Sequence, residues 1–119
     1  MRTLDRVIER APEELVNDES PCRVHGDLWS GNRLIDDQGR PCLIDPAAFH
    51  GNRELDLAMM KLFGGFTEPC MDAYQQTLPL VPGASRRMEF YQLYFLLVHV
   101  NLHGPSWAGQ VAQVAWGLS

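Results

Sequence analysis

The feature that most constrains the fold is a change in the hydrophobic pattern between residues 23 and 45, from helical spacing to short apolar runs. Short apolar runs lie at residues 23–25, 33–35 and 42–44, and residues 37–40 form a turn-type sequence between the last two. We predict a small β-ribbon here, with a functional loop before its hairpin. Apolar residues recur at helical spacing on both sides of this region. The expected fold is therefore α+β and mainly helical, with a short β-ribbon that carries the site.

The segments outside the ribbon predict a series of helices. The residues before Pro21 read as helix with a break at Pro12, because proline removes a helical hydrogen bond. After the ribbon, apolar spacing predicts a helix over residues 55–63 that stops at Gly64. The segment from residue 88 to 103 is apolar nearly all round, which suits a helix buried on most sides. Two more helices are expected, one from Pro69 to before Pro79 and one from about Pro105.

Length and composition set limits on domain number and on partners. With 119 residues and 45% hydrophobic content, residues 1–119 are expected to form a single domain. The net charge of −5 argues against nucleic acid. No stretch reaches the roughly 20 apolar residues of a membrane span, and no signal peptide is recognisable, so we expect a cytoplasmic protein without a membrane partner. The cysteines Cys22, Cys42 and Cys70 fit free thiols.

The polar residues of the ribbon region match the spacing needed for phosphoryl transfer. His25-Gly26-Asp27 is followed by four residues and then Asn32, the spacing of a kinase catalytic loop. Asp45 follows the apolar run 42–44, where the second metal-binding carboxylate of a kinase lies. We therefore expect Asp27 to accept or orient the proton of an acceptor hydroxyl. Asn32 and Asp45 would hold Mg²⁺, which prefers hard oxygen ligands, with ATP as the second substrate.

A plainer interpretation exists for each of these residues taken alone. Asp and Asn beside glycine are common turn residues, and Asp45-Pro46 is ordinary loop sequence. The joint match to independent positional requirements favours the catalytic interpretation. His25 is expected to brace the loop, as the equivalent kinase residue does. Asp56, at the start of a predicted helix, is expected to support the scaffold and the catalytic loop.

The chain also resembles the fructosamine or ketosamine kinases, which share a superfamily with the aminoglycoside and choline kinases. The resemblance covers nearly the whole chain, and residues 28–31, Leu-Trp-Ser-Gly, are its most distinctive part. It implies a protein-kinase-like C-terminal lobe that transfers the γ-phosphate of ATP to a sugar hydroxyl of a ketosamine or glycated amine. It also implies that Asp27 is the catalytic base and that Asn32 and Asp45 bind Mg²⁺. Trp29 becomes a candidate wall of the sugar site, with a hydrophobic plug under the loop as the alternative.

Features of the nucleotide-binding lobe are not recognisable ahead of the loop. The chain's one lysine, Lys61, follows Asp45, and no glycine precedes Gly26. We therefore expect a C-terminal portion of a longer kinase, inactive by itself and prone to form homo-oligomers through exposed apolar surface. Two alternatives stay open. One is a non-catalytic remnant that self-associates, and the other is a phosphotransferase of the aminoglycoside or choline kinase type.

Overall fold

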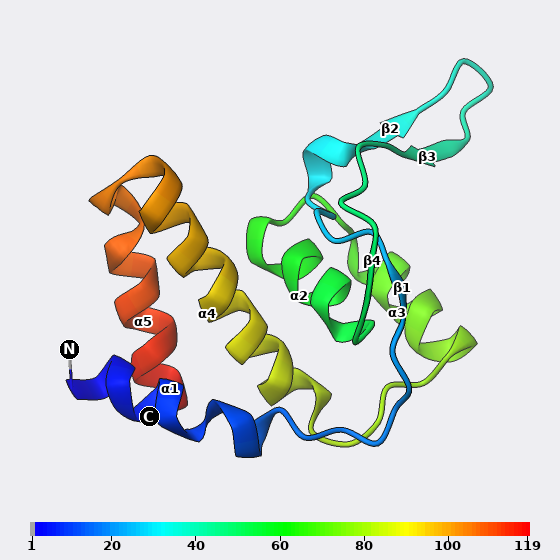
Figure 1. The fold of residues 1–119 in the computed structure, drawn as a ribbon. Helices are drawn as coiled ribbons and strands as arrows, with labels where there is room; N and C mark the ends of the chain where they lie inside the picture. Colours follow the sequence, from blue (N-terminus) through cyan, green and yellow to red (C-terminus); the bar gives the residue numbers. More distant parts are fainter. Residues whose placement is uncertain (1) are drawn as a thin grey trace. The chain divides into compact units, whose positions relative to one another are not determined.

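A computed structural model of the chain describes residues 2–119, and the chain forms two compact units (Figure 1). One unit comprises Met1–Glu19 and Ser85–Ser119, and the other comprises Ser20–Ala84. The regular elements of the first unit are helices. The second unit contains the strands and two helices, α2 and α3, whose bounds are given below. This arrangement confirms the α+β, mainly helical fold predicted from the sequence.

The strands of the second unit form two small antiparallel sheets. Strand β1 (Cys22–Val24) pairs with β4 (Phe49–Gly51), and β2 (Arg33–Ile35) pairs with β3 (Pro41–Leu43). A short 3-10 helix, η1 (Ser30–Asn32), leads from the loop after β1 into β2. The β2–β3 hairpin lies where the apolar runs and the turn sequence predicted it. Its turn is closed by Asp36, whose Oδ1 accepts hydrogen bonds from the backbone N–H groups of Gln38 and Arg40, both at 2.9 Å.

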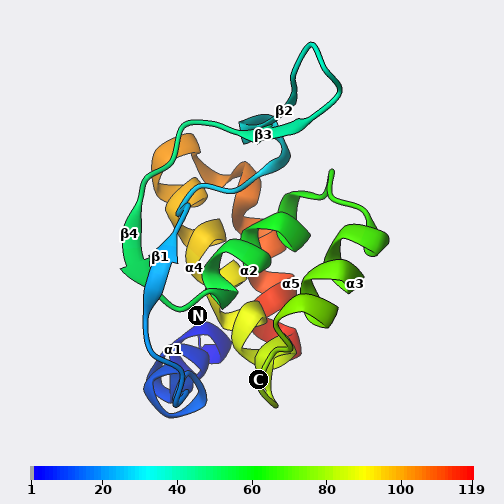
Figure 2. The same ribbon diagram turned by 90° about the vertical axis from the view of Figure 1, so that its right-hand side faces the viewer.

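Two helices complete the second unit, and each begins at a recognisable signal. Helix α2 (Glu54–Phe63) starts where Asn52 Oδ1 accepts the N–H of Glu54 at 2.8 Å, and it ends before Gly64. Helix α3 (Glu68–Thr77) starts at Thr67, whose hydroxyl accepts the N–H of Cys70. Pro69 lies in its first turn, as predicted. Figure 2 shows α2 and α3 running beside each other.

The first unit contains α1 (Arg2–Glu14), most of α4 (Ala84–His103), the 3-10 helix η2 (Pro105–Trp107) and α5 (Ala108–Leu118). Helix α1 packs against α5. Val7, Leu96 and Leu118 are each at most 1% exposed. Glu14 joins α1 to α4. It accepts hydrogen bonds from Arg86 Nε at 2.8 Å and Nη2 at 3.1 Å, and it pairs with Arg10 on its own helix. Both arginines also donate to the carbonyl of Leu118.

Three expectations about the elements need correction. Helix α1 runs through Pro12 to Glu14 without a break, because a proline in the last turn removes only one hydrogen bond. The acceptor it leaves is the carbonyl of Ile8, a residue that is 51% exposed. Strand β4 was not predicted, because its pairing partner β1 is distant in sequence. Helix α4 is less enclosed than expected, since Tyr94 and Leu102 are more than half exposed.

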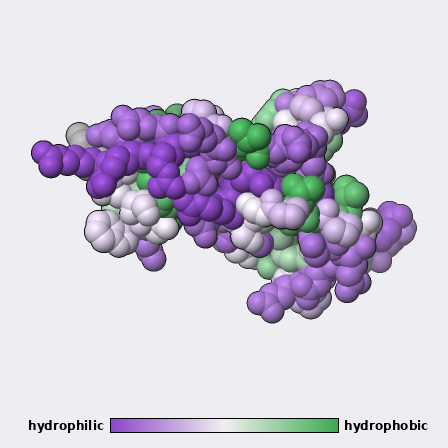
Figure 3. Space-filling view, turned by 90° about the horizontal axis from the view of Figure 1, so that it is seen from below, coloured by the Kyte–Doolittle hydropathy of each residue, from purple (hydrophilic) through white to green (hydrophobic). Residues whose placement is uncertain are grey.

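No helix within residues 2–119 has the length and apolar character needed to cross a membrane. The face drawn in Figure 3 is largely hydrophilic, and its hydrophobic residues appear as small separate patches.

Candidate active site

The candidate catalytic residues lie on the loop that joins β1 to β2. The loop is closed on itself by two backbone hydrogen bonds, from the N–H of Trp29 to the carbonyl of Asp27 at 3.1 Å and from the N–H of Asn32 to the carbonyl of Trp29 at 3.0 Å. A tight loop of this kind brings side chains five residues apart to one place. The sequence spacing of Asp27 and Asn32 therefore becomes a direct contact.

Asn32 orients Asp27. The Asn32 side chain is buried, and its Nδ2 donates to the backbone carbonyl of Asp27 at 2.8 Å and to the carboxylate Oδ2 at 3.2 Å. The Asp27 residue itself is exposed. The carboxylate is thus held from its protein side by an amide donor, while the rest of it faces solvent. A group placed in this way can receive a proton from a hydroxyl that approaches from outside.

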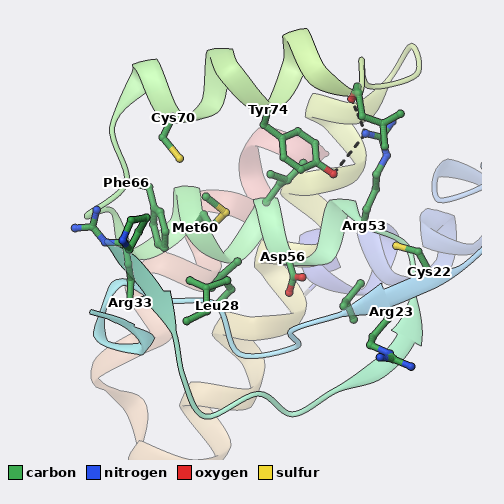
Figure 4. A pocket seen from close by; sticks show the side chains of 15 residues that line it. Cys22, Arg23, Leu28, Arg33, Arg53, Asp56, Met60, Phe66, Cys70 and Tyr74 are labelled. Carbon is green, nitrogen blue, oxygen red and sulfur yellow. Dashed lines mark hydrogen bonds between the residues drawn. The ribbon is translucent and has the colours of Figure 1, made fainter. Parts of the chain in front are cut away.

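Asp56, a residue of α2, fixes the backbone at the start of the loop. Its Oδ2 accepts the N–H of His25 at 2.8 Å, and its Oδ1 accepts the N–H of Gly26 at 2.9 Å. Figure 4 shows Asp56 on α2, directed toward the segment that follows β1. Because a carboxylate with two charge-assisted bonds to adjacent amides has little freedom, α2 sets the position of the loop.

His25 connects the loop to the segment that carries Asp45. Its Nε2 donates to the carbonyl of Ile44 at 2.7 Å, and its Nδ1 accepts the N–H of Asp27 at 3.2 Å. The N–H of Ile44 in turn donates to the carbonyl of Asn32 at 2.9 Å. Ile44 therefore bonds to both ends of the loop, and the structure brings the backbone of Asp45 beside residues 25–32.

Asp45 has an unusual backbone conformation, with φ of +50°. Aspartate tolerates this left-handed region better than most residues, since its short side chain can bond locally. Such strained positions cluster at functional sites, where the surrounding contacts maintain them. The hydrogen bonds of Ile44 supply such contacts for the residue before Asp45.

The donor groups of the site suit a small, hard cation. Because Asn32 uses Nδ2 toward Asp27, its Oδ1 accepts no hydrogen bond from the described residues. That amide oxygen and the carboxylates of Asp27 and Asp45 are oxygen ligands of the kind that Mg²⁺ takes. Among residues 2–119, no three His, Cys, Asp or Glu side chains gather as a metal site.

Trp29 is 44% exposed, so it is not a plug buried beneath the loop. Its ring lies over Gly31, where an added Cβ would come within 2.1 Å of the ring atom Cη2. Only glycine at position 31 leaves room for this arrangement. The Leu-Trp-Ser-Gly sequence therefore encodes a tryptophan folded back over its own loop, with one surface left to solvent.

Gly65 is a site-supporting residue that sequence reasoning interpreted only as a helix stop. A Cβ at this position would lie 2.3 Å from the Cβ of Ser30, so the chain after α2 passes very close to the loop. Arg33, the first residue of β2, stacks its guanidinium on the ring of Phe66 at 5.3 Å in the same connection. The Gly-Gly pair was a visible signal, but its packing partner could not be identified from the sequence.

Comparisons with known proteins identify the family of the chain and agree with its fold. The family model described as fructosamine kinase matches residues 1–116. A protein of Enterococcus faecium named "Probable ketoamine kinase" is 46% identical over 114 residues, which is 96% of this chain and 40% of that protein. The ketosamine-3-kinase of Mus musculus is 38% identical, over 83% of this chain and 32% of its own length.

A solved structure supports the same family assignment. A crystal structure of a protein from Thermobifida fusca assigned as a fructosamine-3-kinase superposes with a TM-score of 0.87 at 39% identity, covering 98% of this chain and 41% of that chain. This chain thus spans about two fifths of the length of the relatives it matches. The family match over nearly all residues, together with the loop geometry, shows that the chain belongs to the fructosamine kinase family.

Proposed function

We propose that this chain carries the catalytic and metal-binding residues of an ATP-dependent kinase that phosphorylates a sugar hydroxyl of a ketosamine, such as a glycated amine. Family membership supports the reaction class. The observation that carries the assignment to this chain is the contact between Asn32 Nδ2 and the exposed carboxylate of Asp27. We further propose that residues 1–119 form part of one kinase-like domain.

In this proposal the oxygen of the acceptor hydroxyl attacks the γ-phosphate, and the carboxylate of Asp27 receives the proton of that hydroxyl. Asn32 holds the Asp27 carboxylate in position, and Asp56 and His25 hold the loop. Asn32 Oδ1 and Asp45 would bind Mg²⁺, which neutralises charge on the phosphate oxygens when bound. The exposed ring surface of Trp29 would form one wall for the sugar, since an aromatic face packs well against the apolar face of a sugar ring.

The test uses a chain of full family length, in which residues 1–119 replace the matching part of the Thermobifida fusca protein. Asp27→Asn is expected to lower kcat for fructosyl-lysine by about 10²- to 10⁴-fold, the range of general base catalysis, with little change in KM. Asp37→Asn, at the exposed tip of the β2–β3 hairpin, is the matched control and should keep full activity. An Asp27→Asn enzyme with unchanged kcat would refute the role of Asp27.

A panel of acceptors separates the proposed substrate class from its neighbours. The same enzyme should phosphorylate ketosamines and leave choline and aminoglycosides unchanged. Turnover of an aminoglycoside or of choline, with ketosamines inert, would support the sibling phosphotransferase interpretation. Residues 1–119 by themselves are expected to show no ATP-dependent phosphorylation, since the phosphate-binding lysine and glycine-rich loop of kinases are not among them.

A further inference from the structure

An aromatic ring beside the catalytic loop has no part in the chemistry proposed above. Phe49, the first residue of β4, is 43% exposed, an exposure close to the 44% of Trp29. A single exposed apolar residue is common on protein surfaces. Phe49 differs from such a residue because the loop that carries Asp27 holds its ring in place.

The ring of Phe49 is bordered by a glycine along each of its two long edges. A Cβ added at Gly26 would lie 2.7 Å from Cε1 and 3.0 Å from Cδ1 of the ring. On the opposite edge, a Cβ added at Gly51 would lie 3.1 Å from Cε2. Gly26 also has φ of +87°, a conformation that disfavours any side chain. Because glycines border both edges, the exposed part of the ring lies on its faces and its tip.

Backbone contacts fix Phe49 relative to the candidate base. The N–H of Ala48 donates to the carbonyl of His25 at 2.9 Å, and Phe49 itself is paired in the β1–β4 sheet. Gly26, which the ring contacts, is the residue directly before Asp27, and consecutive Cα atoms are about 3.8 Å apart. The ring and the candidate base therefore lie next to each other on one braced segment.

Trp29 shows a similar arrangement on the other side of Asp27 in the sequence. Its ring lies over Gly31, and its N–H donates to the carbonyl of Asp27 at 3.1 Å. Asp27 is itself exposed. The loop thus presents two open aromatic surfaces, each packed on a glycine, with the candidate base between these glycines in the sequence.

A ketosamine contains two groups that such a pair of rings can recognise. Its sugar ring has an apolar face, for which Trp29 is the proposed wall. Its amine nitrogen is joined to the sugar through one carbon beside the keto group, so it lies within a few bonds of the sugar hydroxyls. This amine is positively charged near neutral pH. A cation is attracted to the face of an aromatic ring when it lies within about 6 Å of the ring centre.

We propose that Phe49 is a substrate-binding residue whose ring receives the positively charged amine of the ketosamine, while Trp29 packs against the sugar. The carboxylates around the loop have other partners. Asp56 bonds to two backbone amides, and Asp27 and Asp45 serve the acceptor hydroxyl and Mg²⁺ in the function proposed above. Phe49 thereby helps the enzyme to distinguish ketosamines from free sugars, which lack this charge. This inference rests on the proposed function.

The test compares two ligands that differ in charge. Calorimetry of the full-length chimera with the Thermobifida fusca remainder measures binding of 1-amino-1-deoxyfructose, whose amine is charged, and of its N-acetyl derivative, whose amide is neutral. Phe49→Leu removes the ring but keeps an apolar side chain, and it should lower the ratio of the two affinities about fivefold or more. Phe49→Tyr keeps an aromatic face and should keep the ratio. Tyr94→Leu, at an aromatic residue of α4 that is 60% exposed, is the matched control and should change neither affinity.

The ratio separates recognition of the charge from a general disturbance of the loop, because a disturbed loop weakens both ligands alike. An unchanged ratio in Phe49→Leu would overturn the inference, and so would an equal fall of the ratio in Tyr94→Leu. Circular dichroism establishes that each variant is folded before affinities are compared.

Phosphorylation of fructosyl-lysine is measured separately, so the two proposals can fail independently. A chimera that phosphorylates fructosyl-lysine but keeps the ratio in Phe49→Leu would refute the role of Phe49 alone. A chimera in which Phe49→Leu lowers the ratio, yet no ketosamine is phosphorylated, would support the role of Phe49 in binding and refute the proposed reaction.

Discussion

At the scale of single residues, the candidate site depends on a few contacts that orient the loop rather than on burial. Asp27 is exposed, and its position is set by the amide of Asn32 and by the backbone bonds of its neighbours. Asp56 provides the strongest of these constraints, because both of its oxygens are bonded to adjacent amides of the loop. The consequences of losing such contacts can be measured one residue at a time.

Asp56→Ala is expected to lower the free energy of unfolding by about 2–3 kcal/mol, since it leaves two backbone N–H groups without their charged acceptor. The amides of His25 and Gly26 should also lose their protection from hydrogen exchange. Urea denaturation and amide exchange by NMR measure the two effects. Asp72→Ala, an exposed acid on α3, is the control and should change stability by less than about 0.5 kcal/mol. Unchanged protection of both loop amides would contradict the bracing role.

Gly31→Ala should displace the ring of Trp29 without unfolding the chain. The added Cβ would meet the far end of an indole that is already 44% exposed, so the ring can swing outward. In a background with Trp107→Phe and Trp116→Phe, Trp29 fluorescence should be quenched more strongly by acrylamide in the Gly31→Ala variant. Gly39→Ala, at the hairpin tip where an added Cβ meets nothing, is the control for steric contact. Equal quenching in the presence and absence of Gly31→Ala would argue against the packing of Trp29 over this glycine.

At the scale of elements, the connections between helices are fixed by arginines that donate to backbone carbonyls. Arg53, just before α2, donates from Nη1 to the carbonyl of Leu78 at 2.6 Å and from Nη2 to that of Pro79 at 2.7 Å. Its guanidinium also lies 5.7 Å from the ring centre of Tyr74. The beginning of α2 and the end of α3 are thereby held together by one side chain that is only 9% exposed.

Arg53→Lys is expected to destabilise the chain by about 1–2 kcal/mol, because an ammonium group cannot reproduce the planar fork that reaches both carbonyls. Thermal unfolding followed by circular dichroism measures the loss. Arg40→Lys is the matched control, since Arg40 is exposed and its ion pair with Asp36 is a surface contact worth little. Equal effects of the two substitutions would show that the bidentate geometry of Arg53 is unimportant.

The contact between α1 and α4 should make stability depend on pH in acid. Hydrogen bonds from Arg86, and next from Arg10, lower the pKa of the Glu14 carboxyl from 4.5 to about 2. An acid with a lowered pKa in the folded state stabilises that state fully above pH 4.5, and this contribution disappears as the pH falls toward 2. Glu14→Gln should therefore destabilise the chain near neutral pH, and its difference from wild type should shrink between pH 4.5 and 2.

Urea titrations of wild type and Glu14→Gln at several pH values test this expectation. Glu13→Gln changes the neighbouring acid, which forms no ion pair within residues 2–119, and serves as the control. A difference between wild type and Glu14→Gln that stays constant with pH would contradict the assigned ion pair.

At the scale of the whole molecule, apolar surface remains exposed on the β2–β3 hairpin. Leu34, Ile35 and Leu43 are each about half exposed, at 49%, 60% and 56%. Each strand of a two-stranded sheet also has one edge without a partner strand. An exposed apolar hairpin with open edges favours association with another chain. The self-association expected from the sequence therefore has a specific candidate location.

Residues 1–119 are expected to form dimers or larger species whose fraction rises with concentration, as measured by analytical ultracentrifugation. Ile35→Lys should shift this equilibrium toward monomer by about tenfold or more in the association constant, because it places a charge on the hairpin. Ile8→Lys, at a position of similar exposure on α1, is the control and should have little effect. A monomer at all concentrations, or an equal response to the two substitutions, would exclude the hairpin as the interface.

Local patterns in the sequence were enough to predict several parts of the structure. The apolar runs and turn residues predicted the β2–β3 hairpin, glycine marked the end of α2, and the spacing of Asp27 and Asn32 assigned both residues to one loop. These features depend on contacts between residues near each other in the chain. Their geometry follows from backbone preferences and from the fixed reach of short segments.

Other features were decided only by the tertiary structure. The pairing of β1 with β4, the bonds from Asp56 to the backbone of His25 and Gly26, and the close approach of Gly65 to Ser30 join residues far apart in the chain. Their residue types are equally common in turns, strands or helix ends, so the sequence does not specify their partners. By itself the sequence identified the family and the candidate catalytic loop. Packing of α2 against that loop decided how the loop is held, because such contacts depend on how separate segments come together in space.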